Sequence, residues 1–218
     1  MISRRDLLCA GALAPLTSSA FALPAPTFSV GKEFLSVHPM APTPTDKIEV
    51  VEFFAYTCPH CLQFHPVFEE WAKQAPADVS IRICPVAWQP KYLPFTDTYF
   101  ALEALGLLDK LSLQFFESVI YQTRSYNFDS ASGDIRAFMV ENGVDGAKWD
   151  ATVNSFGVKN KSRSAVMLWN AYQIDSTPMV GIGGKFTTGP HLTGSRQATP
   201  ECIDYLVEQV RKLRKLRK

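Results

Sequence analysis

Residues 48–61 read IEVVEFFAYTCPHC, and this stretch joins an almost continuously apolar run to the start of a helical pattern over 62–74. A near-continuous apolar run is typical of a strand that is buried on both faces. Residues 79–86 form a second β-branched, apolar segment. The order strand, helix, strand predicts a βαβ unit with a parallel pair of strands. Pro66 is expected to interrupt and kink the helix, because proline lacks an N–H and crowds the preceding turn.

Two cysteines, Cys58 and Cys61, stand three positions apart where the predicted helix begins. A helix N-terminus carries unpaired N–H groups and partial positive charge, which favour a thiolate on the first sulfur. Such a pair exchanges disulfides through a mixed-disulfide intermediate, with Cys58 as the attacking thiol and Cys61 as the resolving thiol. We expect Pro59 and His60 to set how strongly the thiolate is favoured, His60 by its positive polarisation.

An acidic residue, Glu52, interrupts the apolar strand six positions before the first cysteine. Burial disfavours a charged carboxylate, so we expect a raised pKa for Glu52 and a role in accepting and returning the proton of Cys61. The alternative is a Glu52 that pairs with a cation such as Lys47 or Arg82 and only balances charge. His65 is predicted to be a helix-surface residue or a local hydrogen-bond partner.

The pattern changes after this unit. Residues 94–175 read as a series of helices separated by glycines, a block the size of a small domain. Strand patterns resume at 179–182 and 185–188 around Gly183-Gly184, which is a two-residue hairpin signal, and residues 199–216 form a closing amphipathic helix. A short strand over 33–37 is expected at a sheet edge. This order predicts one continuous α/β fold that is interrupted by a helical insertion.

The N-terminus has the pattern of an export signal. Residues 1–5 are basic, 7–16 are largely apolar, and the small residues of Ala20-Phe21-Ala22 predict cleavage after Ala22. The apolar part is too short for a permanent membrane anchor. Residues 3–8 also resemble a twin-arginine signal, so the general secretory and twin-arginine routes both remain open.

Composition narrows the class of protein further. The 218 residues carry a formal net charge of +1, and six cations crowd the last eight positions as a predicted solvated helix end. No basic stripe interleaved with aromatic residues runs through the body of the chain, which argues against nucleic acid as a partner. No second Cys-x-x-Cys or His-x-His pair completes a zinc site, so no metal is predicted. Whether Cys84 and Cys202 form a second bridge stays open.

Several of these features occur together in one known family. The chain resembles the thioredoxin superfamily, and more narrowly the DsbA family of periplasmic thiol oxidases, in Val51–Phe54, in Cys58-Pro59-His60-Cys61, in the helical insertion, in Thr177-Pro178 and in the export signal. The resemblance implies a thioredoxin-like fold with an inserted helical domain. The expected parts are a signal peptide (1–22), the two parts of the thioredoxin-like domain (23–93 and 176–218), and the helical insertion (94–175).

The resemblance also implies an activity and its partners. The expected protein is a periplasmic, monomeric thiol:disulfide oxidoreductase that introduces disulfides into reduced, unfolded exported proteins, using no cofactor beyond its Cys58–Cys61 disulfide. A membrane quinone-linked thiol reoxidase would restore that disulfide. Thr177 and Pro178 would form the cis-proline loop that binds substrate. The alternatives are a disulfide isomerase or reductase on the same fold, and a non-redox binding module with a structural disulfide.

Overall fold

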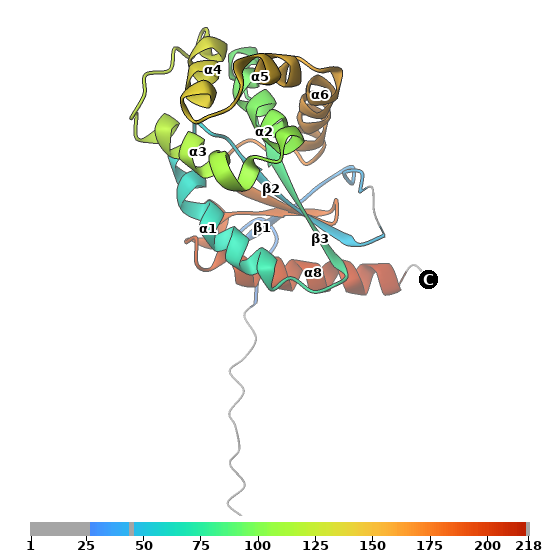
Figure 1. Ribbon diagram of the computed structural model, residues 1–218. Coiled ribbons are helices and arrows are strands. Elements are labelled where there is room, and N and C mark those ends of the chain that lie inside the picture. Colours follow the sequence, from blue (N-terminus) through green and yellow to red (C-terminus); the bar gives the residue numbers. More distant parts are fainter. Residues whose placement is uncertain (1–26, 44–45, 217–218) are drawn as a thin grey trace, which may run out of the picture.

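The computed structural model describes residues 27–43 and 46–216 (Figure 1). The predicted signal peptide, 1–22, lies outside the described residues. Of the four cysteines expected after its removal, all are described and all are free thiols. The structure therefore shows the reduced form of the cysteine pair.

A five-stranded sheet forms the centre of the molecule, in the spatial order β1-β5-β4-β2-β3. Its strands are β1 (Phe34–Ser36), β2 (Ile48–Phe54), β3 (Val79–Pro85), β4 (Met179–Ile182) and β5 (Phe186–Thr188). Strands β2 and β3 pair in parallel, as predicted, and the other pairs are antiparallel. Every residue of β2 is buried, which explains its nearly unbroken apolar sequence. The strand expected over 33–37 is confirmed at the sheet edge, as β1.

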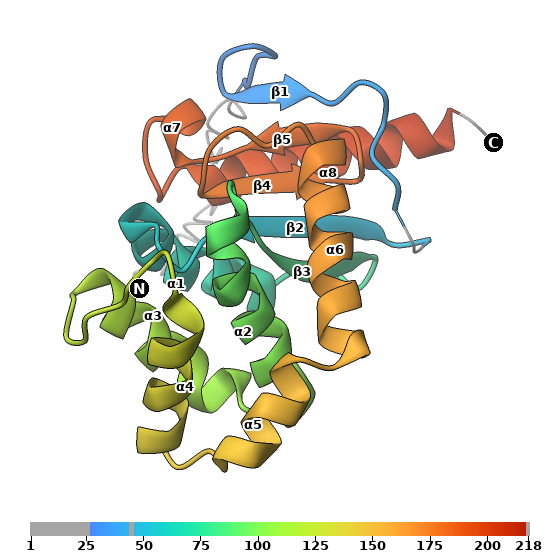
Figure 2. The ribbon, with the colours of Figure 1, turned by 90° about the horizontal axis from the view of Figure 1, so that it is seen from above.

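Helices cover both faces of the sheet (Figures 1 and 2). One face carries α1 (Pro59–Lys73) and α8 (Thr199–Lys215); the other side carries α2 (Leu93–Leu105), α3 (Leu113–Ile120), α4 (Ala131–Glu141), α5 (Gly146–Val153) and α6 (Phe156–Ala171). The helices α2 to α6 all lie between β3 and β4 in the chain, in the segment for which a helical insertion is expected. The remaining helical segments are η1 (Pro90–Tyr92), η2 (Leu108–Ser112) and α7 (Pro190–Thr193).

The local structure differs from the sequence patterns at three places. Helix α1 runs from Pro59 to Lys73 without a break, although Pro66 lies inside it. Within the segment predicted to be a series of helices, residues 108–120 are divided into the π-helical η2 and the α-helical α3, and the short helix α7 has no counterpart among the predicted elements. Periodicity is a weak guide to such short or wide turns, because the packing around a segment decides them rather than its own sequence pattern.

The sheet separates two hydrophobic cores. Val51 and Phe53 pack with the helices of the insertion, whereas Ile48 and Val50 pack with α1 and α8, since successive side chains of a strand point to opposite faces. Cys84 belongs to the first core and donates a hydrogen bond to the Ala165 carbonyl of α6, 3.7 Å away. The remaining cysteine, Cys202 of α8, belongs to the second core. The two buried thiols therefore lie on opposite sides of the sheet and do not form the second bridge.

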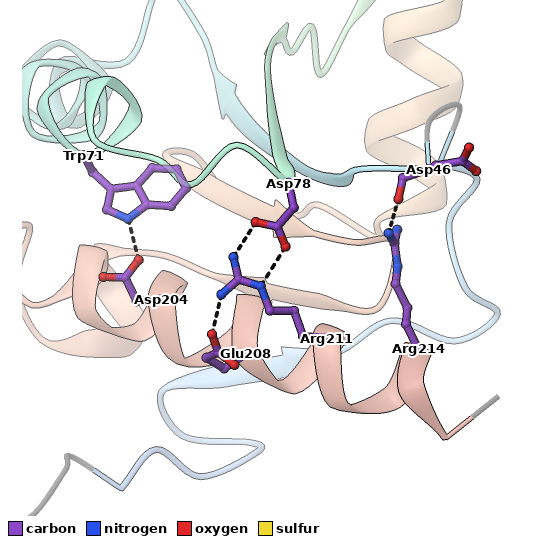
Figure 3. Close-up of polar contacts among 7 residues, drawn as sticks. All are labelled: Asp46, Trp71, Asp78, Asp204, Glu208, Arg211 and Arg214. Atoms are coloured by element: carbon purple, nitrogen blue, oxygen red, sulfur yellow. Dashed lines mark hydrogen bonds and ion pairs between the residues drawn. The ribbon is translucent and has the colours of Figure 1, made fainter. Parts of the chain in front are cut away.

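Polar contacts join α8 to α1 and to the residues just before β2 and β3, at the opposite end from the cysteine pair (Figure 3). The contacts join Trp71 to Asp204 (2.8 Å), Arg211 to both Asp78 and Glu208, and Arg214 to the main-chain carbonyls of Asp46 and Lys47. The basic tail was predicted to be simply solvated. That expectation was wrong for the two arginines, because the strand ends bring acceptors within reach, whereas Lys212 and Lys215 are exposed.

The packing around Gly181 of β4 leaves no room for a side chain. A Cβ at this position would overlap the Tyr172 ring and lie 2.9 Å from the ring of Phe53. We expect Gly181→Ala to lower the free energy of unfolding by about 1–3 kcal/mol, the usual cost of overpacking a core. Gly133→Ala is the matched control, because it lies in α4 with nothing within 4 Å of the added atom. Urea unfolding of both variants tests this; equal effects would contradict it.

Candidate active site

The N-terminus of α1 holds the two cysteines. Cys58 is the N-cap residue, and its Sγ accepts a hydrogen bond from the Cys61 backbone N–H at 3.2 Å. Pro59 occupies the first helical position, where the missing N–H would have had no helical partner. Cys58 is partly exposed and Cys61 is fully buried. An incoming group can therefore approach the first sulfur but not the second, and His60 lies exposed between them in sequence.

A segment distant in sequence completes the site. The Thr177–Pro178 peptide bond is cis, as the family resemblance implies. The register that places Phe53 opposite Met179 brings the start of β4 to the end of β2 that leads into α1. The Cys58 thiol consequently donates a hydrogen bond to the Thr177 carbonyl at 3.4 Å. Thr177 is half-buried and Pro178 is buried, so the backbone just before the proline borders the reactive sulfur.

The surroundings of the two thiols push their pKa values in opposite directions. The pKa of Cys58 is lowered from 9.0 to about 6, chiefly by the hydrogen bond from the Cys61 side chain. Burial opposes this shift, and the Thr177 side chain, the Cys61 N–H and the charge of His60 add to it, His60 least of the five. Burial raises the pKa of Cys61, and a neighbouring Cys58 thiolate raises it further. One sulfur is thus set to be an anion near neutral pH while the other stays protonated.

The relative sizes of these contributions to the Cys58 pKa lead to a prediction. In the reduced protein its thiolate should form with a midpoint near pH 6. Cys61→Ala should raise that midpoint more than His60→Gln, because the Cys61 side chain makes the largest contribution and the His60 charge the smallest. Thiolate absorbance in the ultraviolet, or the pH dependence of alkylation at Cys58, measures both shifts. A larger effect from His60 would contradict the structure.

Glu52 is completely buried in β2, and its hydrogen-bond partner is neither Lys47 nor Arg82, the two cations that the alternative interpretation named. Its Oε2 lies 2.7 Å from Nδ1 of His65, while Arg82 lies 3.6 Å from Glu49 instead. Burial raises the pKa of Glu52, and contact with His65 partly offsets that rise. The sequence holds one signal for this contact. His65 lies four residues after Cys61, and residues four apart share one helix face, so His65 is expected on the same face of α1 as Cys61. Lys47, the other cation in that alternative, precedes the strand.

A groove of about 630 Å³ opens beside His65, between α1, β3 and the η2–α3 segment. Its wall includes Phe54, Glu69, Tyr99 and Phe116 as well as the histidine.

In the part of the chain that the structure describes, no group of three or more His, Cys, Asp or Glu side chains is arranged to hold a metal ion. In those same residues, no helix has both the length and the apolar character needed to cross a membrane.

Comparison with known proteins gives consistent results. Residues 43–199 match a family model described as thioredoxin. The chain is 38% identical to a thiol:disulfide interchange protein DsbA of Bordetella parapertussis over 209 residues, covering 94% of this chain and 96% of that protein. It is 34% identical to a DsbA of Burkholderia cepacia over 206 residues, 94% of each chain. The crystal structure of Pseudomonas aeruginosa DsbA superposes with a TM-score of 0.79 at 29% identity, covering 86% of this chain and 97% of that one.

Proposed function

Because the chain belongs to the DsbA family of thiol:disulfide interchange proteins and is a protein-disulfide oxidoreductase with a thioredoxin-like fold, we propose that Cys58 and Cys61 are its redox pair. The observation that carries this proposal is the pairing of a partly exposed thiol, whose pKa is about 6, with a buried thiol whose pKa is raised. A stabilised thiolate is a good leaving group and favours the reduced form of the pair. This effect supports the direction implied by the family, in which the protein disulfide is reduced and the substrate is oxidised.

The proposed reaction balances in two displacements. A substrate thiolate attacks Cys58 Sγ of the 58–61 disulfide, and the electron pair of the broken bond passes to Cys61, which takes up a proton because its pKa is high. A second thiol of the same substrate loses its proton and attacks the substrate sulfur that is bonded to Cys58 in the mixed disulfide. This step releases the Cys58 thiolate and the substrate disulfide. The substrate has lost two electrons, and the protein has gained them as one thiolate and one thiol.

Glu52 is proposed to supply the proton for Cys61 and to recover it when the disulfide forms again. Its carboxyl is fully buried, and burial raises its pKa, so its protonated form persists to higher pH than that of an exposed glutamate. Oε2 is occupied by His65, but Oε1 is buried and has no protein partner among the described residues. An acid that is kept away from water and has one uncommitted oxygen suits such an exchange.

Thr177 and Pro178 are proposed to position the substrate. The Thr177 carbonyl lies 3.4 Å from Cys58 Sγ, so a substrate chain joined to that sulfur must run past the Thr177 backbone. An extended segment can pair there through main-chain hydrogen bonds, which suits unfolded substrates because such contacts do not depend on sequence. The proline offers no competing N–H donor at this point.

The remaining parts of the proposal follow from the family. The protein works in the periplasm as a monomer, acts on reduced, unfolded exported proteins, and needs no cofactor beyond its own disulfide. A membrane quinone-linked thiol reoxidase accepts the two electrons from the Cys58–Cys61 dithiol and so regenerates the oxidant. Electron transfer by thiol exchange needs only a second dithiol/disulfide couple of higher potential.

The experiment that tests this function is oxidative refolding. The oxidised protein is mixed with a reduced, unfolded protein that has native disulfides, without oxygen or glutathione. We expect one substrate disulfide for each protein disulfide consumed, and no activity from a Cys58→Ala variant. Activity only on scrambled disulfides would indicate an isomerase instead. A 58–61 bond that resists mild reduction would indicate a binding module.

A further inference from the structure

A hydrogen bond to His65 connects the buried carboxyl of Glu52 toward the surface. The Oε2 atom of Glu52 lies 2.7 Å from His65 Nδ1. His65 Nε2 lies 3.4 Å from Glu69 Oε1 on the next turn of α1. Exposure rises along this series, since the side chains are 0%, 28% and 54% exposed in turn. Three groups that can bind protons thus lead from the interior to the surface.

The hydrogen bond between Glu52 and His65 can hold its proton at either end. A Glu52 protonated on Oε2 donates from that atom to Nδ1, whereas a carboxylate, or an acid protonated on Oε1, accepts at Oε2 from an Nδ1–H. No other ionisable side chain in the described residues has a hydrogen bond to Glu52. The opposite ring nitrogen, Nε2, reaches the half-exposed edge of the groove beside α1. An imidazole in this position can accept a proton on one nitrogen and release one from the other.

We propose that His65 conducts protons between the Glu52 carboxyl and solvent, and so acts as a positioning residue for the redox pair. The proposal rests on the proposed role of Glu52 as the proton partner of Cys61. During reduction of the disulfide, Glu52 gives its Oε1 proton to the Cys61 thiolate. Oε2 then takes the proton from His65 Nδ1, and Nε2 takes one from water.

Reoxidation reverses each of these transfers. Cys61 returns its proton to Glu52, the Oε2 proton passes to His65 Nδ1, and the Nε2 proton leaves to solvent. The histidine therefore regains its starting tautomer once in every cycle, and its ring does not have to flip. One proton enters during reduction and one leaves during reoxidation, so the relay stores no net charge.

The charges around the ring favour this role. Burial lowers the pKa of His65, but the hydrogen bond and charge of Glu52, together with the charge of Glu69, outweigh burial and raise the pKa above 6.5. The other titratable groups on the groove wall are Lys73 of α1, Tyr99 of α2 and Asp109 of η2. The ring also stacks near Phe54 of β2, with centroids 6.4 Å apart. A histidine held between these two carboxyl groups has a proton partner near each ring nitrogen.

The test compares His65→Gln with His38→Gln in the full mature chain. Glutamine can still hydrogen-bond to Glu52 but does not take up a proton, whereas His38 is exposed and its side chain takes no part in the site. The rate at which dithiothreitol reduces the 58–61 disulfide is followed from pH 5 to 9 by acid quench and alkylation. At pH 7 we expect His65→Gln to be about tenfold slower, below the full range for general acid–base catalysis because water can replace part of the relay. His38→Gln should match the wild type.

Added imidazole separates proton conduction from a structural effect. It should restore most of the lost rate to the glycine variant His65→Gly, in proportion to its concentration, and leave the wild type unchanged. A His65→Gln variant with the wild-type rate and pH profile, or a slow His65→Gly variant that imidazole does not help, would overturn the proposal. If Glu52→Gln is slow while His65→Gln is not, the proposed function survives and only this relay fails. Failure of the wild type to exchange at all would overturn the function itself.

A second measurement does not depend on any variant folding. The imidazole of His65 in the unmodified protein can be titrated by NMR in the oxidised and reduced forms. We expect its pKa and tautomer signature to differ between the two forms, because Glu52 exchanges its proton with the redox pair. Identical titrations in both forms would overturn the relay.

Discussion

Replacing Cys61 by alanine is expected to abolish turnover and to leave the protein covalently joined to its substrates through Cys58. The Cys58 thiolate of the variant can still attack a substrate disulfide and release one substrate thiolate. The mixed disulfide then has no resolving thiol, because Cys61 is the sulfur that α1 places beside Cys58. The other two cysteines, Cys84 and Cys202, are buried in the two cores and held by their own hydrogen bonds.

The measurement is a non-reducing gel of the variant after it has been mixed with disulfide-containing substrate proteins. We expect adducts that disappear on reduction. The double variant Cys58→Ala/Cys61→Ala should form none. Cys84→Ala is a matched control for the loss of a buried thiol, and should keep wild-type turnover if it folds. Absence of adducts with Cys61→Ala would rule out Cys58 as the attacking sulfur.

The second large effect is expected in the stability of the two redox forms. In the reduced form Cys58 has a folded-state pKa of about 6 against 9.0 for the ordinary thiol. A group whose pKa is depressed by folding contributes stability above its unfolded pKa and loses it as pH falls through the folded pKa. This contribution is about 0.1 kcal/mol at pH 5, about 1.4 at pH 7 and about 2.7 at pH 8. The oxidised form has no thiol at this position and lacks the contribution.

The disulfide itself acts in the opposite direction. Closing a four-residue loop restricts the unfolded chain and stabilises the oxidised form by about 2 kcal/mol, with little dependence on pH. The two magnitudes predict a crossover: the oxidised form is the more stable below about pH 7, and the reduced form is the more stable by pH 8. Groups whose pKa is the same in both forms cancel in the difference.

Guanidinium unfolding of each form between pH 5 and 8 tests this expectation. The stability of the reduced form relative to the oxidised form should rise by about 2.5 kcal/mol over this range. Cys58→Ala removes the titrating thiol from the reduced form, and its stability should lose that part of the pH dependence. A difference between the redox forms that does not change with pH would mean that Cys58 ionises as an ordinary thiol.

The sequence alone predicted the framework of this protein. The apolar run of β2 indicated a strand buried on both faces, and the βαβ pattern indicated its parallel pairing with β3. The hairpin signal at Gly183-Gly184 correctly indicated two antiparallel strands there. These features follow from local patterns, in which the period of the hydrophobic residues and the turn residues carry the information. The motif Cys58-Pro59-His60-Cys61 likewise indicated thiol exchange, because neighbours in the chain build that part of the site.

The contacts between segments that are distant in sequence could not be predicted from local sequence patterns. The Thr177 carbonyl reaches Cys58 only because β4 pairs with β2 in one particular register. Whether Cys84 and Cys202 could meet depended on which face of the sheet each thiol packs against. The partner of Glu52 depends on how α1 lies across β2, and it is His65 rather than Lys47 or Arg82, the cations that the alternative interpretation named. Local patterns indicate which element a segment forms and which residues that element carries. Packing decides which residues meet across the sheet, because a strand and a helix can meet in several registers.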